Sequence, residues 1–282
     1  LPFLFKILAA EKALSVQVHP NKHQAELGFA REEQESIPLT AGHRNYKDSN
    51  HKPELVYAIT EYQAMNGFRE FNEILVLFRK LDSSELAGLV EEFGNNLDSL
   101  GLEVFFRELL TLDDQRKHHA LEQLLTYADA HQDQAEFALV TELSHQYPND
   151  IGLFCVLLLN LITLKPGEAM YLNANTPHAY IQGTGLEIMA NSDNVLRAGL
   201  TPKHIDVAEL VACTEFTPIP FERLLLAPSK LGQCDSYDIP VSDFDFNIFH
   251  RPQQEEVITS GAEILMAIDD DLTLVSQKGE HL

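Results

Sequence analysis

Cysteine, tryptophan and basic residues are all scarce in this sequence of 282 residues. Tryptophan is absent, and the three cysteines, Cys155, Cys213 and Cys234, are far apart and form no Cys-x-x-Cys pair. This spacing argues against a cysteine-based structural zinc site. It predicts free thiols in a reducing cytoplasm.

Positive charge is in short supply as well. Lys and Arg number 20 against 43 Asp and Glu, which gives a formal net charge of −23. Such acidity argues against nucleic-acid binding and against attraction to an anionic membrane surface. The same field repels anionic substrates, so any phosphate site must be built from a few local Lys and Arg side chains.

Long apolar runs are missing too. The most apolar stretch, from Cys155 onward, is interrupted by Asn160 and soon meets Lys165, and it falls short of the roughly 20 residues that a membrane span needs. The opening LPFLFKIL is too short and wrongly flanked for a secretory signal. We therefore expect a cytoplasmic chain without a membrane span. Because it begins with Leu1, we expect it to be a fragment.

The pattern of apolar residues changes twice along the chain. Short β-type runs, LPFLFKIL, LSVQVH and ELVYAIT, lie within residues 1–66, with a polar loop expected over 21–53. Helical spacing then dominates residues 70–147 and predicts four or five helices. Asp82 with Glu85, and Asp133 with Glu136, have the spacing of capping boxes at helix starts.

After residue 150 the β pattern returns, in FCVLLLNLITL, EAMYLN, HAYIQG and LEIMA. Residues 262–268 and 272–275 also favour strands around an acidic turn. The simplest architecture is a β-domain interrupted by a helical insertion.

The strand SVQVH devotes one face to polar side chains. Ser15, Gln17 and His19 alternate with Val16 and Val18, so they share one face. Two further segments place polar groups at strand ends. Glu54 starts LVYAIT, and His178, Tyr180 and Gln182 share a face of HAYIQG.

Imidazole, carboxylate and amide oxygen together suit a borderline divalent cation. Gln17, His19, Glu54 and His178 could hold Zn²⁺ with a position left open for water or substrate. Two His and one carboxylate also match the ligand set of non-haem Fe(II) oxygenases. The types of ligand alone do not decide between zinc and iron.

Five segments resemble a known family, the type I mannose-6-phosphate isomerases, which are zinc-dependent enzymes of the cupin fold. The segments occur in the family's order and span most of residues 1–210. They are QVHPNK (17–22), NYKDSNHKPEL (45–55), AMNGFRE (64–70), GEAMYLNANTPHAY (167–180) and GLEIMANSDNVLRAGLTPK (185–203).

The resemblance implies a cupin jelly-roll, a β-sandwich or barrel, with an inserted helical domain. It implies a first part of the catalytic cupin domain at 1–66, the helical domain at 67–150 and the remainder of the catalytic domain at 151–213. Residues 214–282 would begin a second, incomplete cupin-like domain. The family's Tyr-Ala-Trp-Gly element and final strands are missing here, so we expect N-terminal and C-terminal segments to be lacking.

The same resemblance implies interconversion of mannose 6-phosphate and fructose 6-phosphate through a cis-enediol. It implies one Zn²⁺ per chain, a small sugar phosphate as partner, a monomer, and a place in carbohydrate metabolism and GDP-mannose biosynthesis. Alternatives are an Fe(II)-dependent cupin oxygenase, which would leave several basic residues unused, and a non-catalytic sugar-binding cupin. Oxygen uptake and metal analysis separate the first from an isomerase.

Residue roles follow from the matched motifs. The zinc ligands would be Gln17, His19, Glu54 and His178, and the catalytic residues Arg197, Lys52 and Glu187. The substrate-binding residues would be Ser15, Lys22, Tyr180, Asp193 and Lys203. The proton-transfer base stays open between Glu187, with a pKa raised by burial, and Lys52, with a pKa lowered by burial or the metal.

Overall fold

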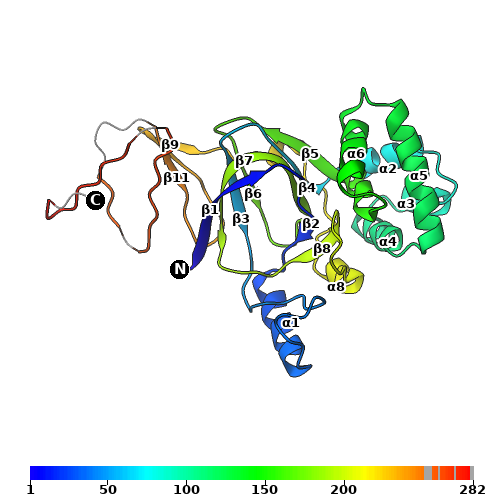
Figure 1. Cartoon of the computed structure of the whole chain (residues 1–282), viewed down its shortest axis with the longest axis horizontal. Helices are drawn as coiled ribbons and strands as arrows, with labels where there is room; N and C mark the ends of the chain where they lie inside the picture. Colours follow the sequence, from blue (N-terminus) through cyan, green and yellow to red (C-terminus); the bar gives the residue numbers. More distant parts are fainter. Residues whose placement is uncertain (251–255, 260, 270, 280–282) are drawn as a thin grey trace.

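The computed structural model describes residues 1–250, 256–259, 261–269 and 271–279. Strands form the centre of the molecule, and a block of helices lies at one side of them (Figure 1). A small second sheet and the C-terminal segment lie at the opposite side. The predicted β part interrupted by helices is confirmed at this level.

Eleven strands are present in the described part of the chain. They are β1 (Phe3–Ala10), β2 (Val16–Val18), β3 (Glu54–Ala58), β4 (Tyr62–Phe68), β5 (Leu159–Leu164), β6 (Ala169–Leu172), β7 (His178–Ala190), β8 (Leu196–Gly199), β9 (Ser229–Leu231), β10 (Cys234–Ser236) and β11 (Asn247–Phe249).

The helices fall into three groups. They are α1 (Lys22–Gln34), the block α2 (Phe71–Lys80), α3 (Ala87–Asn95), α4 (Ser99–Leu110), α5 (Asp114–Ala130) and α6 (Ala135–Gln146), and the short α7 (Cys155–Leu158) and α8 (Val207–Ala212). Two 3₁₀ turns cover Ile151–Phe154 and Phe221–Arg223. No helix in these described ranges is long and apolar enough to cross a bilayer.

Strand β7 connects the whole eight-stranded sheet. Its first residues pair with β4 and β2, and its later residues pair with β1 and β3, always antiparallel. The two runs HAYIQG and LEIMA are therefore one continuous strand of 13 residues. Residues far apart in sequence, on β1, β2 and β3, become neighbours through it.

Alternate residues of β7 face different surroundings. Ala179 and Ile181 pack in the large core shared with the helical block, whereas Tyr180 packs in a second core with residues of β3 and β6. His178 shares the face of Tyr180, because side chains two apart on a strand point the same way. The polar face of this strand is thus turned away from the helices.

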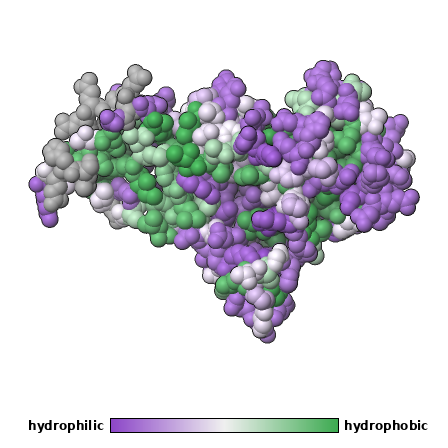
Figure 2. Space-filling model, viewed as in Figure 1, coloured by the Kyte–Doolittle hydropathy of each residue, from purple (hydrophilic) through white to green (hydrophobic). Residues whose placement is uncertain are grey.

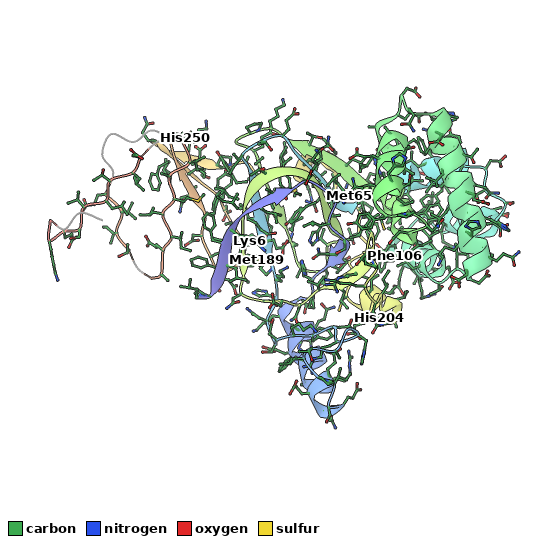
Figure 3. All side chains as sticks on the ribbon, in the orientation of Figure 1. Lys6, Met65, Phe106, Met189, His204 and His250 are labelled. Atoms are coloured by element: carbon green, nitrogen blue, oxygen red, sulfur yellow. The ribbon has the colours of Figure 1, made fainter. Side chains whose placement is uncertain are left out.

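The helical block packs against the outer face of β4. Phe68 contacts Phe106 of α4 and stacks on Phe216, with ring centroids 5.8 Å and 5.4 Å apart. Met65 and Phe106 lie at this junction, while Lys6 and Met189 lie on strands away from the helices (Figure 3). The five helices α2–α6 confirm the predicted number.

Both predicted capping boxes are wrong. Helix α3 begins after Leu86 and α6 after Gln134, and neither N-cap makes a side-chain hydrogen bond. Asp82 instead has a φ of 45° in the preceding turn. Effective caps come from Asp98 and Asp113 at α4 and α5.

Two other segments differ from expectation. The polar loop predicted over 21–53 contains the 13-residue helix α1, which starts with a capping box between Asn21 and Gln24. The run FCVLLLNLITL starts as helix and becomes a strand only at Leu159. An apolar run alone does not distinguish a buried helix from a buried strand.

The C-terminal part forms the three-stranded sheet β9–β11. The strands expected at 262–268 and 272–275 are wrong, since the described residues from 256 to 279 contain no strand. Figure 2 shows apolar side chains gathered over this side of the molecule, whereas the outer helices are hydrophilic. Exposed apolar residues of the C-terminal part include Leu231, Ile258 and Ile264.

Candidate metal centre

Three predicted ligands meet at one point inside the strands. His19 follows β2, Glu54 begins β3 and His178 begins β7, and ligand atoms of the three lie within 4.8 Å of one another. His19 Nε2 is 3.4 Å from Glu54 Oε1, and His178 Nε2 is 3.6 Å from Glu54 Oε2. All three side chains are buried. The structure therefore brings three of the four predicted ligands together.

The outward-facing nitrogens of both imidazoles are fixed by backbone carbonyls. The Nδ1–H of His19 donates to the Asn194 carbonyl at 2.7 Å, and that of His178 donates to the Thr176 carbonyl at 2.9 Å. A carbonyl only accepts, so each ring carries a proton on Nδ1 and turns its Nε2 toward Glu54. The buried His19 Nε2 has no hydrogen-bond partner among the described residues.

Electrostatics favour the forms that bind a cation. Burial, followed by the positive charge of Lys52, lowers the pKa of His19 to about 4, so this imidazole is neutral near pH 7. Burial opposes ionisation of Glu54, but the charge of the nearby Lys52 ammonium outweighs it and holds the pKa of Glu54 well below the usual range. Two imidazoles and one carboxylate, with an orphaned nitrogen on His19, fit a divalent metal such as zinc.

Lys52 and Tyr180 both reach the ligand carboxylate. The Lys52 ammonium lies 2.9 Å from Glu54 Oε1, and the Tyr180 hydroxyl donates to Glu54 Oε2 at 2.7 Å. Each residue was expected in the pocket, and the structure places each beside a ligand.

Strand register brings Gln17 and Arg197 to the same face as His178. Gln17 of β2 lies directly opposite His178 on one side and Arg197 of β8 on the other. Directly opposed residues of antiparallel strands point to the same face of a sheet. Arg197 is half-buried, and burial lowers its pKa. Its guanidinium makes no hydrogen bond or ion pair with the rest of the described chain.

Glu187 is the second buried carboxylate near the cluster. It lies on β7 directly opposite Lys6 of β1, whose ammonium is 2.7 Å from Glu187 Oε2. Burial, reinforced by the charge of Glu54, raises the pKa of Glu187. Lys6 was missed at the sequence level, although it is the single charged residue in the apolar run LPFLFKIL.

The remaining predicted residues are more exposed than the three residues of the cluster. Lys22 is exposed and donates to Ser49 and Asn50. Asp193 and Lys203 are exposed, and Ser15 is half-buried. The cluster of His19, Glu54 and His178 includes none of these side chains, and their role in binding substrate stays a prediction.

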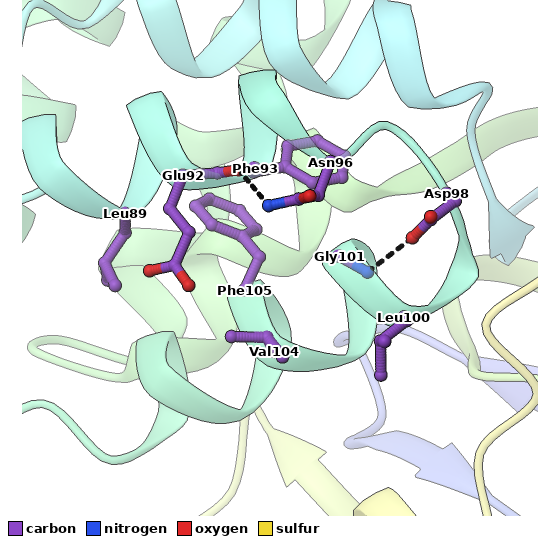
Figure 4. Close-up of a pocket in the computed structure, with 9 residues that line it drawn as sticks. All are labelled: Leu89, Glu92, Phe93, Asn96, Asp98, Leu100, Gly101, Val104 and Phe105. Carbon is purple, nitrogen blue, oxygen red and sulfur yellow. Dashed lines mark hydrogen bonds between the residues drawn. The ribbon is translucent and has the colours of Figure 1, made fainter.

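A surface pocket of about 220 Å³ lies elsewhere, between α3 and α4 (Figure 4). The side chains of Asn96 and Asp98, which line this pocket, form hydrogen bonds at the ends of these helices. Asn96 donates to the Glu92 carbonyl and Asp98 caps Gly101. This pocket belongs to the helical block and contains none of the predicted site residues.

Fold and site together define a metal-binding protein with a β core and a helical insertion. Residues 1–71 match the family described as phosphomannose isomerase type I, catalytic domain, and residues 82–159 match its helical insertion domain. The mannose-6-phosphate isomerase of Escherichia coli (strain K12) is 48% identical over 275 residues, covering 97% of this chain and 70% of that protein.

Solved structures agree with these matches. A variant of phosphomannose isomerase from Salmonella typhimurium has a TM-score of 0.84 and 48% identity, covering 88% of this chain and 62% of that one. A zinc-bound mannose 6-phosphate isomerase has a TM-score of 0.83 and 49% identity, with the same coverage. The chain thus spans less than two thirds of these structures. It belongs to the type I phosphomannose isomerase family, as the sequence motifs predicted.

Proposed function

We propose that this protein is a zinc-dependent aldose-ketose isomerase that interconverts mannose 6-phosphate and fructose 6-phosphate through a cis-enediol. The observation that carries the proposal is the buried cluster of His19, Glu54 and His178 with a second carboxylate, Glu187, beside it. The relatives named for this reaction and the zinc in one related structure support it.

His19, Glu54 and His178 would hold the zinc ion, with Gln17 as the fourth ligand. Gln17 is supported by its position opposite His178, and its neutral amide adds no charge to the site. Bound there, zinc would supply Lewis-acid chemistry that favours negative charge on the sugar oxygens. One ion per chain is expected.

Glu187 is the proton-transfer base in this proposal. Its raised pKa brings the carboxylate closer to the pH at which it both accepts and returns a proton efficiently. Lys6 holds Oε2, which leaves Oε1 to carry the proton between C2 and C1. Lys52 is already paired with Glu54, so in this proposal it serves as a positive charge. The sequence left the base open between Glu187 and Lys52, and we propose Glu187.

The substrate's negative charges are met by the basic residues around the cluster. Arg197, half-buried and without a polar partner among the described residues, stabilises the enediolate or the phosphate. Lys22 and Lys203 attract the phosphate from the exposed side. The remaining lining residues are Ser15, Tyr180 and Asp193.

We also propose a division of the chain into domains. The strands form a cupin jelly-roll, divided into catalytic parts at 1–66 and 151–213 and a helical domain at 67–150. Residues 214–282 begin a second cupin-like domain. The protein acts as a cytoplasmic monomer.

A coupled assay of mannose 6-phosphate conversion, before and after chelation, tests this function. We expect turnover that a chelator abolishes and added zinc restores. Oxygen uptake with Fe(II) and a keto-acid co-substrate serves as the control for the oxygenase alternative, and should be absent. Full turnover after complete metal removal would overturn the proposal.

A further inference from the structure

Asn194 is fully buried in the connection between β7 and β8, where its amide bonds to the backbone of a distant loop. Its Oδ1 accepts from the backbone N–H of Lys47 at 2.7 Å and of Asp48 at 3.2 Å. Its Nδ2 donates to the carbonyls of Asp48 and Asn50, both at 2.8 Å. One side chain thereby satisfies four main-chain groups.

That loop has no regular structure of its own. Residues 44–53 contain neither helix nor strand, so their buried polar groups depend on side-chain partners. Only a carboxamide offers two donor hydrogens and two acceptor lone pairs on one side chain. The side chain of Asn194 therefore supplies the hydrogen bonds that a neighbouring strand would otherwise provide to this loop.

The backbone of Asn194 forms hydrogen bonds to His19 and Ser192. Its carbonyl accepts the Nδ1–H of His19 and so sets the orientation of that imidazole. Its N–H donates to the Ser192 hydroxyl, which in turn donates to the Asn50 carbonyl. The carbonyl that holds His19 is therefore anchored by the same residue that anchors the loop.

The loop leads directly to the other half of the site. Lys52 follows Asn50 by two residues, and Glu54 follows by four. A shift of the loop would move Lys52 and Glu54 relative to His19, which is held from β2 and from Asn194.

We infer that Asn194 is a positioning residue that locks the His19 segment and the Lys52–Glu54 segment into one register, so that the metal ligands converge before any ion binds. Asn194 is not one of the three residues of the metal cluster and acts through the carbonyl that holds His19. The inference rests on the proposed zinc isomerase function, and it deepens that proposal by naming what fixes the site's geometry.

The test compares two substitutions of the same kind. Asn194→Asp keeps the size and the Oδ1 acceptor but loses every hydrogen bond that Nδ2 donates, to the carbonyls of Asp48 and Asn50 and to the Asp48 carboxylate. Asn191→Asp adds the same charge three residues earlier, where an exposed side chain donates only to the Leu1 carbonyl. Zinc affinity is measured by competition with a chromophoric chelator, without sugar.

We expect Asn194→Asp to weaken zinc binding about tenfold, the lower end of the effect seen for residues that orient metal ligands. Asn191→Asp should bind zinc like the unaltered protein. In NMR spectra of the metal-free protein, the His19 Nδ1–H signal should exchange faster in Asn194→Asp, while the His178 signal, held by Thr176, stays unchanged.

If Asn194→Asp fails to fold, Ser192→Ala is the second variant. It removes only the hydrogen bonds of the Ser192 hydroxyl, which accepts from the Asn194 N–H and donates to the Asn50 carbonyl. It should weaken zinc binding about threefold, as expected for one net hydrogen bond. Unchanged zinc affinity and an unchanged His19 signal in a folded Asn194→Asp protein, with only a lower melting temperature, would overturn the inference. A failure of the isomerase assay on the unaltered protein would refute the function and leave these metal-binding results interpretable.

Discussion

The Tyr180 hydroxyl donates a hydrogen bond of 2.7 Å to Oε2 of Glu54, the carboxylate that lies between the two imidazoles. Tyr180 is fully buried, and burial together with the charge of Glu54 raises the pKa of its hydroxyl well above the usual value. The hydroxyl is therefore a permanent donor. It fixes one oxygen of the ligand carboxylate while His178 approaches the same oxygen.

Tyr180→Phe is expected to weaken zinc binding about tenfold, because residues that hold a ligand in place carry effects of this size. The measurement is a competition titration with a chelator. Tyr62→Phe is the matched control. Tyr62 is a buried tyrosine in ring contact with Tyr180, and its hydroxyl has no hydrogen-bond partner among the described residues. Equal losses in the two variants would contradict the role assigned to the Tyr180 hydroxyl.

The ligand cluster could be predicted from sequence because its signal is local. Polar residues alternate with apolar ones at the ends of strands, as for Gln17 and His19, so the polar side chains share one face. Core packing does not explain such a face. The family motifs then fixed which distant segments belong together. The structure brings His19, Glu54 and His178 into one cluster.

The contacts of Lys6 and Asn194 could not be predicted in the same way. Lys6 meets Glu187 only because β1 pairs with β7, and the register of strands far apart in sequence is not encoded in either strand alone. Asn194 lies in a loop, where asparagine usually indicates a turn. Its bonds to the loop of residues 47–50 exist only in the folded chain.

Helix α1 was missed for a different physical reason. Its buried face consists of Ala25, Gly28 and Glu32, so it carries no apolar stripe. Glu32 is buried because it pairs with Arg44 at 3.1 Å and accepts from the backbone N–H of Tyr46. A helix held by a buried ion pair looks like a polar loop in sequence.

The stability of the metal-free protein should depend on pH through His19. Its pKa is about 4 in the fold and 6.5 as a free side chain, so the unfolded state binds more protons between these values. The stabilisation is complete above pH 6.5 and is lost as the pH falls toward 4. Between pH 7.5 and pH 5 the loss amounts to about 2 kcal/mol.

Urea unfolding in the presence of a chelator at these two pH values measures that loss. His19→Gln removes the titrating group and should flatten the difference by about the same amount. Glu54 acts in the same direction only below its ordinary pKa of 4.5, so it contributes little at pH 5. An equally steep pH dependence in His19→Gln would show that another group is responsible.

Glu187→Gln should lower kcat by at least about 100-fold, since a general base contributes roughly that much or more. Zinc content should stay at one ion per chain, because Glu187 is not among the ligands. In the unaltered protein the acid limb of kcat/KM should lie above 4.5, the ordinary value for a glutamate, because the pKa of Glu187 is raised. A kcat within a few-fold of the original would instead point to Lys52 as the base.

Gly152, in the 3₁₀ turn Ile151–Phe154, packs closely against the end of β8, the strand that carries Arg197. A Cβ at position 152 would lie 2.5 Å from the Leu200 nitrogen and 2.7 Å from the Gly199 Cα, and neither backbone atom can turn aside. Asp150 fixes the same contact by accepting from the N–H groups of Gly152 and Leu200. Any added side chain must therefore separate the two segments.

Gly152→Ala is expected to destabilise the protein by about 2 kcal/mol, in the range for overpacking a close contact. Gly88→Ala is the matched control, because a Cβ in this helix of the insertion meets no atom within 4 Å, and it should stabilise by about 0.5–1 kcal/mol through helix propensity. Urea unfolding midpoints measure both changes. Because β8 also positions Arg197, Gly152→Ala should lower kcat/KM even where the protein is fully folded, while Gly88→Ala leaves it unchanged. Equal stability changes of the same sign in the two variants would show that the junction at Gly152 is looser than its backbone contacts indicate.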